Sequence, residues 1–99
     1  MIDLTSSEFA EVRAILFRHV PNCMVWAFGS RVTGKAKPYS DLDLAVRSPA
    51  GLLSLEVLAL LREAFAKSTL PIRVDVVDWH ALPPGLQAII TQQHESIIP

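Results

Sequence analysis

The sequence is poor in several features, and each shortage excludes a class of protein. It has one cysteine among 99 residues, so it cannot form an internal disulfide. Cys23 begins the apolar run CMVWAF, and we expect a buried, unreactive thiol there. Glu56 interrupts the most apolar run, which is about half the length of a membrane-spanning helix. The N-terminus lacks the basic start and apolar stretch of a signal peptide, so we expect a cytoplasmic protein.

An excess of positive charge is also missing. Nine Lys and Arg residues stand against ten Asp and Glu residues, and no basic block occurs. This balance argues against a dedicated nucleic-acid binder, because such proteins cluster their cations. Hydrophobic residues make up 51% of the chain, which is a high share for a small domain with little interior. We therefore expect residues 1–99 to form one domain that uses part of its apolar surface to contact a partner.

Periodicity and turn residues predict the order helix, strand, loop, strand, helix, strand, helix. The first helix should have Thr5 as its N-cap and Glu8 as capping-box partner, and should end at about His19. The other predicted elements are strands over 23–28, 41–47 and 72–79 and helices over 52–67 and 85–94. The first turns of 52–67 are apolar nearly all round, which predicts burial on more than one side. The fold class is a small α+β (α/β-like) domain with a sheet of three to four strands.

Two aspartates in the second predicted strand form the most informative pair. Asp41 and Asp43 alternate with apolar residues in DLDLAVR, so both side chains project from one face. At about 3.3 Å per residue their Cα atoms are roughly 6.6 Å apart, so the carboxylates can converge. Paired acids repel each other unless a hard cation such as Mg²⁺ takes their oxygens as ligands. Because two such ions can clamp the attacking and leaving oxygens of a phosphoryl displacement, the pair predicts a metal site.

A Gly-Ser pair precedes these acids by ten intervening residues. Gly29 and Ser30 end the first predicted strand, where a residue without a side chain lets backbone N–H groups approach a phosphate. The Ser30 hydroxyl adds a further donor. Arg31, Lys35 and Lys37 follow as cations for a triphosphate, and Arg31 is favoured because it adjoins the pair. The alternative is that these three residues only keep the loop soluble.

Asp75 is the third candidate acid. Two valines flank it in the third predicted strand, so its side chain points opposite to theirs. If this strand lies beside the second, Asp75 joins Asp41 and Asp43 on one face and could both bind metal and accept a proton from an incoming hydroxyl. The alternative is an acid that protects an edge strand from aggregation. Asp78, three residues on, should point to the other face.

These residues resemble the signature of a known family. Gly29-Ser30, the ten-residue spacer and Asp41-Leu42-Asp43-Leu44 are similar to the motif of minimal nucleotidyltransferase (MNT) domains, members of the DNA polymerase β-like nucleotidyltransferase superfamily. The segment RVDVVDW around Asp75 is similar to that family's third-acid strand. The resemblance implies a mixed sheet with ATP and two Mg²⁺ ions at one edge. It also implies that Asp41 and Asp43 bind the metals, that Asp75 completes the catalytic and metal site, and that Gly29 and Ser30 hold the β- and γ-phosphates.

The resemblance implies a partner as well. Many MNT domains resemble antitoxins that pair with a small helical HEPN-domain toxin, which some of them inactivate by adenylylating a tyrosine. We therefore expect Mg²⁺-dependent transfer of AMP to a hydroxyl of a partner protein, with the apolar segment 52–61 as a candidate contact surface. Two alternatives stay open: a non-catalytic nucleotide-binding module that occludes its partner, and a transferase acting on a small molecule or an RNA 3′ end. A homo-oligomer also stays open.

Overall fold

A four-stranded mixed sheet forms the centre of the protein in the computed structural model, which describes residues 2–97. The strands are β1 (Met24–Phe28), β2 (Leu42–Arg47), β3 (Val74–Asp78) and β4 (Glu95–Ile97), in the order β3-β2-β1-β4. β1 is antiparallel to both β2 and β4, whereas β2 and β3 are parallel. A parallel pair needs a long crossover, and the helix between β2 and β3 supplies it.

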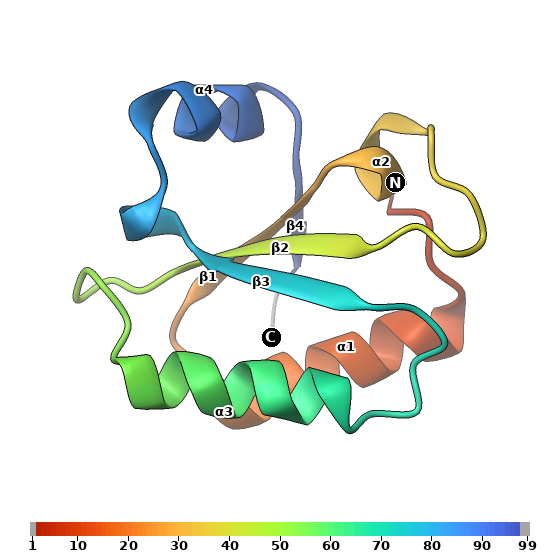
Figure 1. Ribbon diagram of the computed structural model, residues 1–99, viewed down its shortest axis with the longest axis horizontal. Helices are drawn as coiled ribbons and strands as arrows, with labels where there is room; N and C mark the ends of the chain where they lie inside the picture. Colours follow the sequence, from red (N-terminus) through yellow and green to blue (C-terminus); the bar gives the residue numbers. More distant parts are fainter. Residues whose placement is uncertain (1, 98–99) are drawn as a thin grey trace.

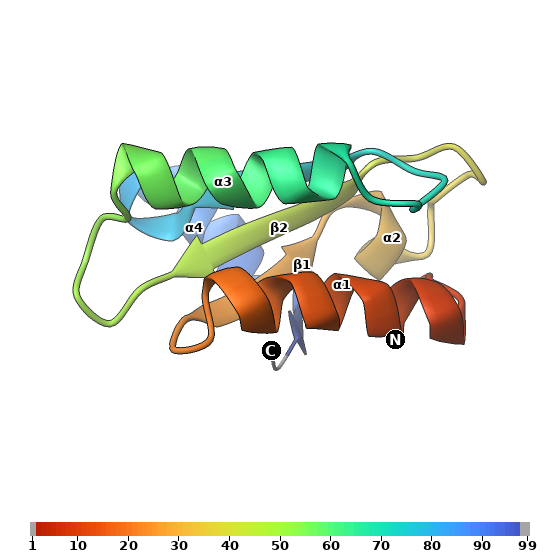
Figure 2. The same cartoon turned by 90° about the horizontal axis from the view of Figure 1, so that it is seen from below.

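The helices divide between the two faces of the sheet. α1 (Ser6–His19) and α3 (Leu55–Ala66) lie side by side beneath one face, as Figures 1 and 2 show. The short α2 (Ser30–Thr33) and α4 (Pro84–Gln92) lie on the other side, toward opposite ends (Figure 1). A 3-10 turn, Trp79–Ala81, leads from β3 toward α4.

The main core fills the space between the sheet and the α1–α3 pair. Alternate residues of the strands enter it, because successive side chains of a strand point to opposite faces. Its fully buried members include Val12, Leu16, Val25, Ala27, Leu42, Leu44, Val46, Leu61 and Val76. A second, smaller cluster of Ala45, Trp79 and Ile90 packs on the opposite face. This cluster covers the α4 end of that face and leaves the end near α2 available for a functional site (Figure 1).

The structure confirms the predicted start and end of the first helix, α1. The Thr5 hydroxyl accepts the Glu8 amide at 3.1 Å, and the Thr5 amide donates to Glu8 Oε1 at 2.9 Å. This reciprocal capping box satisfies two amides that a helix start leaves without partners. The helix then continues to His19, as predicted.

The structure corrects the prediction for 52–67. α3 begins at Leu55, because Ser54 is its N-cap and the Ser54 hydroxyl accepts the Val57 amide at 3.1 Å; the Leu53 amide before it donates to the Asp78 carboxylate at 2.7 Å. Among its residues only two are buried, so the expectation of burial on more than one side is wrong. The helix packs along a single face, and Leu52 and Leu55 are 68% and 85% exposed. An apolar surface therefore remains at the start of α3.

Three smaller observations complete the fold. The sequence pattern does not predict β4, which is only three residues long and depends on its pairing with β1. Cys23 is half-buried rather than buried. Within residues 2–97, none of the helices has the length and apolar character needed to cross a membrane.

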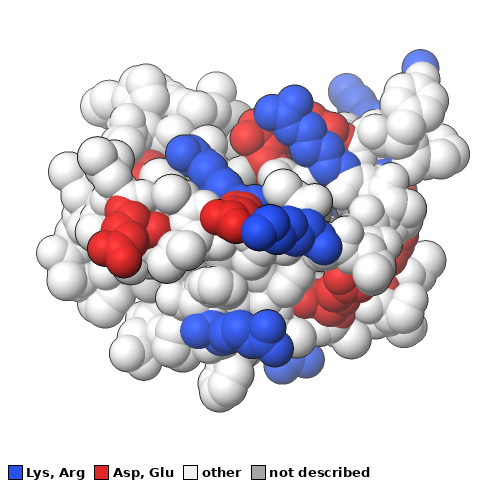
Figure 3. All heavy atoms as spheres, turned by 60° about the horizontal axis from the view of Figure 1, so that its bottom comes forward, with Lys and Arg blue, Asp and Glu red and all other residues white. Residues whose placement is uncertain are grey.

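The outer surface of α1 and α3 carries charges of both signs. Acidic and basic side chains lie interspersed on this side of the molecule, without a large block of either sign (Figure 3). One contact between them is the i, i+4 ion pair of Lys67 and Glu63, 2.6 Å apart at the C-terminal end of α3. Exposed pairs of this kind contribute little to stability, because water and salt screen them.

Candidate active site

Asp43 and Asp75 are direct neighbours on two adjacent strands. The parallel register of β2 and β3 pairs their Cα atoms. The residues on either side of Asp43 are buried in the core beneath the sheet, so its carboxylate projects from the opposite face. Asp41 lies two residues before Asp43, just ahead of β2, and projects from the same face. We call Asp41, Asp43 and Asp75 the acidic row. The structure thus brings all three predicted acids to one end of one face.

Asp43 occupies a position that disfavours its negative charge. Burial raises the pKa of the Asp43 carboxyl, and the negative charges of Asp75 and Asp41 raise it further. Asp43 is half-buried, whereas Asp41 and Asp75 are exposed. A divalent cation placed among these groups would relieve the repulsion, and a set made only of oxygen donors suits Mg²⁺.

The three carboxylates lie around the place where a cation could bind, but they are not close enough together to ligate it. In the part of the chain that the structure describes, no three His, Cys, Asp or Glu side chains converge closely enough to hold a metal ion as they stand. Ligation by all three acids requires the two exposed side chains to rotate toward Asp43. Their donor type, their shared face and the repulsion at Asp43 nevertheless fit a Mg²⁺ site.

Gly29 follows β1 and lies against Asp43. Its backbone angles, φ 80° and ψ −158°, fall in a region that essentially only glycine adopts. The register of β1 and β2 ends with Phe28 opposite Asp43, so the glycine comes next to the acid. A Cβ atom on Gly29 would collide with Asp43 Oδ2. Glycine is therefore required here both by conformation and by the space that the carboxylate occupies.

Ser30 begins the short helix α2 beside this glycine. The amides of Ser30 and Arg31 come first in the helix and so have no intrahelical acceptor. The Val32 and Thr33 amides donate to the Gly29 carbonyl at 3.0 and 3.1 Å, which fixes the turn. Backbone donors thus stand next to Asp43, an arrangement suited to an anion.

Arg31 has a different environment from the predicted one. Its side chain is only 5% exposed, and its guanidinium donates to the carbonyl oxygens of Asp3 (2.7 Å), Ser40 (2.9 Å), Pro38 (3.1 Å) and Lys37 (3.4 Å). These bonds tie the N-terminal segment and the loop after α2 to the helix itself. The geometry favours a structural role over the predicted phosphate contact. Sequence adjacency could not reveal this, because one acceptor lies 28 residues away.

Asp78 has a structural role and is not one of the clustered acids. It is buried, and its carboxylate accepts the Leu53 amide at 2.7 Å and the His80 amide at 3.0 Å. Its position three residues after Asp75 puts it on the opposite face, as expected. Of the two acids in β3, only Asp75 can join Asp43.

Comparison with known proteins places this arrangement in a family. The family described as "Polymerase beta, Nucleotidyltransferase" matches residues 11–99, which is most of the chain. The chain belongs to this family. This membership confirms the resemblance to nucleotidyltransferases that the sequence motif indicated. The mixed four-stranded sheet confirms the expected fold class. It is 50% identical over 91 residues to a Haemophilus influenzae protein named "Probable protein adenylyltransferase MntA", a match that covers 90% of this chain and 77% of that protein.

Solved structures resemble this nucleotidyltransferase over nearly its whole length. A crystal structure of a toxin–antitoxin with AMP-PNP has a TM-score of 0.75 and 26% identity, and the match covers 90% of this chain and 71% of that chain. A crystal structure of the toxin–antitoxin MntA–HepT has a TM-score of 0.69 and covers 94% of this chain and 71% of that one. At 22% identity the second match shows the fold alone.

Proposed function

We propose that residues 1–99 form one minimal nucleotidyltransferase domain that transfers AMP from ATP to a hydroxyl of a partner protein in the cytoplasm. The observation that carries this proposal is the register pairing of Asp43 with Asp75, beside Gly29. Two relatives add support: one is named a protein adenylyltransferase, and another is a toxin–antitoxin structure with the ATP analogue AMP-PNP. The proposed partner is a helical HEPN-type toxin, and the proposed acceptor is a tyrosine.

Each residue of the site has a proposed role. Asp41, Asp43 and Asp75 would hold two Mg²⁺ ions, and Gly29 and Ser30 would bind the β- and γ-phosphates. When bound, Mg²⁺ supplies positive charge that offsets the carboxylates and the triphosphate. Asp75 accepts the proton of the acceptor hydroxyl. The hydroxyl oxygen forms a bond to the α-phosphorus, the bond from that phosphorus to the oxygen bridging it to the β-phosphate breaks, and pyrophosphate leaves.

Transfer of labelled AMP to a co-expressed partner protein tests this function. Replacing Asp41→Asn together with Asp43→Asn removes two proposed metal ligands, and we expect transfer to fall by roughly a hundredfold or more. Glu56→Gln with Glu63→Gln is the matched control, because it removes two exposed carboxylates of α3 far from the sheet's acidic row. Mass spectrometry of the partner locates the adduct. Unchanged transfer by the aspartate variant contradicts the proposal.

The exposed leucines at the start of α3 favour a second candidate, a module that neutralises its partner by occlusion. Leu52 and Leu55 are largely exposed, and apolar surface of this kind is typical of protein contacts. If occlusion suffices, the variant that loses both Asp41 and Asp43 still neutralises the partner. If that variant binds the partner but no longer neutralises it, occlusion is excluded and transfer is required.

A further inference from the structure

The loop between α2 and β2 carries Tyr39, the single tyrosine of the chain. Its side chain is 75% exposed. In Figures 1 and 2 this loop forms the right-hand extremity of the molecule, beyond α2. No role assigned so far to the site involves this tyrosine. Because a tyrosine hydroxyl is also the acceptor proposed for the partner protein, the chemistry of the site applies to Tyr39 as well.

The backbone around Tyr39 is fixed in a tight turn formed by residues 37–40. The Ser40 amide donates to the Lys37 carbonyl at 3.0 Å, and the Lys37 amide donates to the Ser40 hydroxyl at 2.8 Å. The buried Arg31 donates to the carbonyls of Pro38 at 3.1 Å and Ser40 at 2.9 Å. The turn therefore presents the tyrosine in a defined conformation, which lowers the entropy lost on binding.

Two lysines make the surroundings of this tyrosine basic. Lys35 and Lys37 are exposed and precede Tyr39 by four and two residues, and residues 34–40 contain no acid. The acidic row has the opposite charge, and ATP bound beside it adds the charge of a triphosphate. Two Mg²⁺ ions offset only part of this charge. The site therefore attracts an acceptor that is basic around its tyrosine, as this loop is.

We infer that Tyr39 is itself an acceptor of AMP, and that the molecule that modifies it is a second copy of this chain. The inference rests on the proposed function and names a further protein substrate of the same site. Modification between two molecules is favoured because the hydrogen bonds around the turn prevent it from folding back over its own carboxylates. A second copy meets the tyrosine as an exposed tip whose lysines complement the acidic row.

Transfer to Tyr39 follows the same steps as the transfer proposed for the partner protein. The phenolic proton of Tyr39 passes to Asp75 of the catalytic copy. The phenolic oxygen forms a bond to the α-phosphorus of ATP, the bond from that phosphorus to the oxygen bridging it to the β-phosphate breaks, and pyrophosphate leaves. The product carries AMP on the turn that leads into Asp41 of the modified copy.

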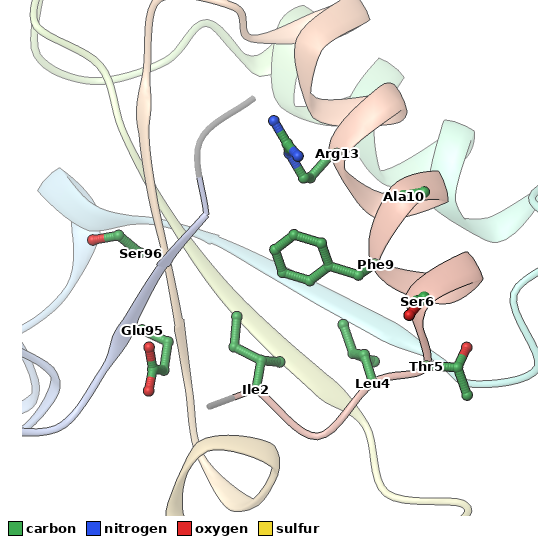
Figure 4. A pocket seen from close by; sticks show the side chains of 9 residues that line it. All are labelled: Ile2, Leu4, Thr5, Ser6, Phe9, Ala10, Arg13, Glu95 and Ser96. Atoms are coloured by element: carbon green, nitrogen blue, oxygen red, sulfur yellow. The ribbon is translucent and has the colours of Figure 1, made fainter.

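Other exposed hydroxyls provide a comparison. A groove of about 480 Å³ lies between α1 and β4. Figure 4 shows Thr5 and Ser6 at the start of α1, with Ser96 of β4 across the groove from them. The Thr5 hydroxyl already accepts the Glu8 amide as a helix cap. These side chains are alcohols on regular elements, and an alcohol gives up its proton less readily than a phenol does, so we expect no transfer to them.

Incubation of the purified protein with labelled ATP and Mg²⁺, without any partner protein, tests the modification. We expect AMP on Tyr39 of the wild type, located by mass spectrometry of its peptides, and no AMP on Tyr39→Phe. Ser6→Ala removes an exposed hydroxyl of the groove between α1 and β4 and should be labelled like wild type. Equal labelling of Tyr39→Phe and wild type, or no labelling of wild type, overturns the inference.

A mixture of two variants tests transfer between copies. Tyr39→Phe keeps the proposed active site but lacks the acceptor, whereas Asp41→Asn with Asp43→Asn keeps the acceptor but lacks two proposed metal ligands. We expect neither variant to be labelled alone, and the aspartate variant to be labelled in the mixture at a rate that rises with the concentration of Tyr39→Phe. No labelling in the mixture, while wild type labels itself, overturns the role of the second copy.

The same mixture tests the role of the lysines. Lys35→Met with Lys37→Met is introduced either into the acceptor copy or into the catalytic copy. Because the lysines act beside the acceptor tyrosine, the change should lower labelling roughly tenfold in the acceptor copy and by less in the catalytic copy. The reverse order means that the lysines serve ATP in their own site, and it overturns the proposed recognition.

Transfer to a co-expressed partner protein is measured in parallel, so that the two proposals can fail separately. Labelling of the partner without labelling of Tyr39 overturns the inference and leaves the proposed function in place. Labelling of neither protein overturns both, because the inference needs the same active site. Labelling of Tyr39 alone supports the inference and contradicts the partner protein as acceptor.

Discussion

Gly29 and Asp43 lie so close that one added methyl group on the glycine would overlap Oδ2 of the acid. We expect Gly29→Ala to abolish most transfer and to cost about 1–3 kcal/mol of stability, because the backbone angles at this position also exclude alanine. Gly34→Ala is the matched control, since Gly34 also has a positive φ, 82°, but a Cβ there meets no described atom within 4 Å. It should lose about 1 kcal/mol and keep its activity per folded molecule. Urea unfolding and AMP transfer separate the two effects.

Arg31 should act on the site through the loop it holds rather than through phosphate. Arg31→Met leaves four backbone carbonyls without their donor, so we expect a loss of about 3 kcal/mol of stability. Arg31→Lys should recover only part, because an ammonium cannot span the same four acceptors. Lys35→Met, an exposed change in the same loop, should alter stability by less than about 0.5 kcal/mol. If Arg31→Met matched this control in urea unfolding, the structural role would be wrong.

The raised pKa of Asp43 predicts a stability effect that depends on pH in the absence of divalent cations. A folded-state pKa above the ordinary 3.8 means that the folded protein binds the proton more tightly than the unfolded chain does. Stability therefore falls as pH rises from 3.8 through the raised pKa, and the penalty is complete above it. Asp43→Asn removes this penalty, so with EDTA the variant should be more stable than wild type at pH 7. The advantage should vanish at pH 3, and a larger gain at pH 3 than at pH 7 would contradict this.

Adding Mg²⁺ should reverse that order. A ligand that binds only the folded state stabilises it by about 2.7 kcal/mol at a hundredfold excess over Kd. Wild type should gain such stability in thermal melts, and Asp43→Asn should gain much less because one proposed ligand is gone. Equal gains would place the Mg²⁺ site elsewhere.

Asp75 and Asp78 should respond in opposite ways to the same substitution. Asp75→Asn should lose transfer and keep its stability, because the Asp75 carboxylate is exposed and belongs to the acidic row. Asp78→Asn should lose about 2 kcal/mol, since one of its two oxygens becomes an amide that cannot accept the amide of Leu53 or His80. Its activity per folded molecule should persist. Denaturant unfolding combined with transfer assays distinguishes the two, and similar profiles for both variants would contradict the assignment.

Local signals determine those parts of the fold that the sequence predicts well. Thr5 and Glu8 are three residues apart and cap α1 by themselves, so the helix start is readable from the chain. Alternation alone puts Asp41 and Asp43 on one face, and Asp75 on the opposite face from its valine neighbours. Whether these acids meet depends on strand order, which the pattern leaves conditional and the parallel register decides.

The remaining features depend on contacts between distant segments. The segment before α3 is held by Asp78, which lies 25 residues along the chain from Leu53 and accepts its amide. The partners of Arg31 include the carbonyl of Asp3, and no spacing rule connects the two. The hydrophobic pattern likewise overstates the burial of α3, since a helix on the outside of the domain packs along one face only.

The bond from Arg62 to the Val76 carbonyl has a consequence for the behaviour of the protein at high concentration. Unpaired strand edges are templates on which copies of a chain can stack into fibrils. With one carbonyl of β3 already taken by a bulky cationic side chain, a second β3 cannot pair along the full length of this edge. Arg62 thus hinders self-association of the protein through this edge of its sheet.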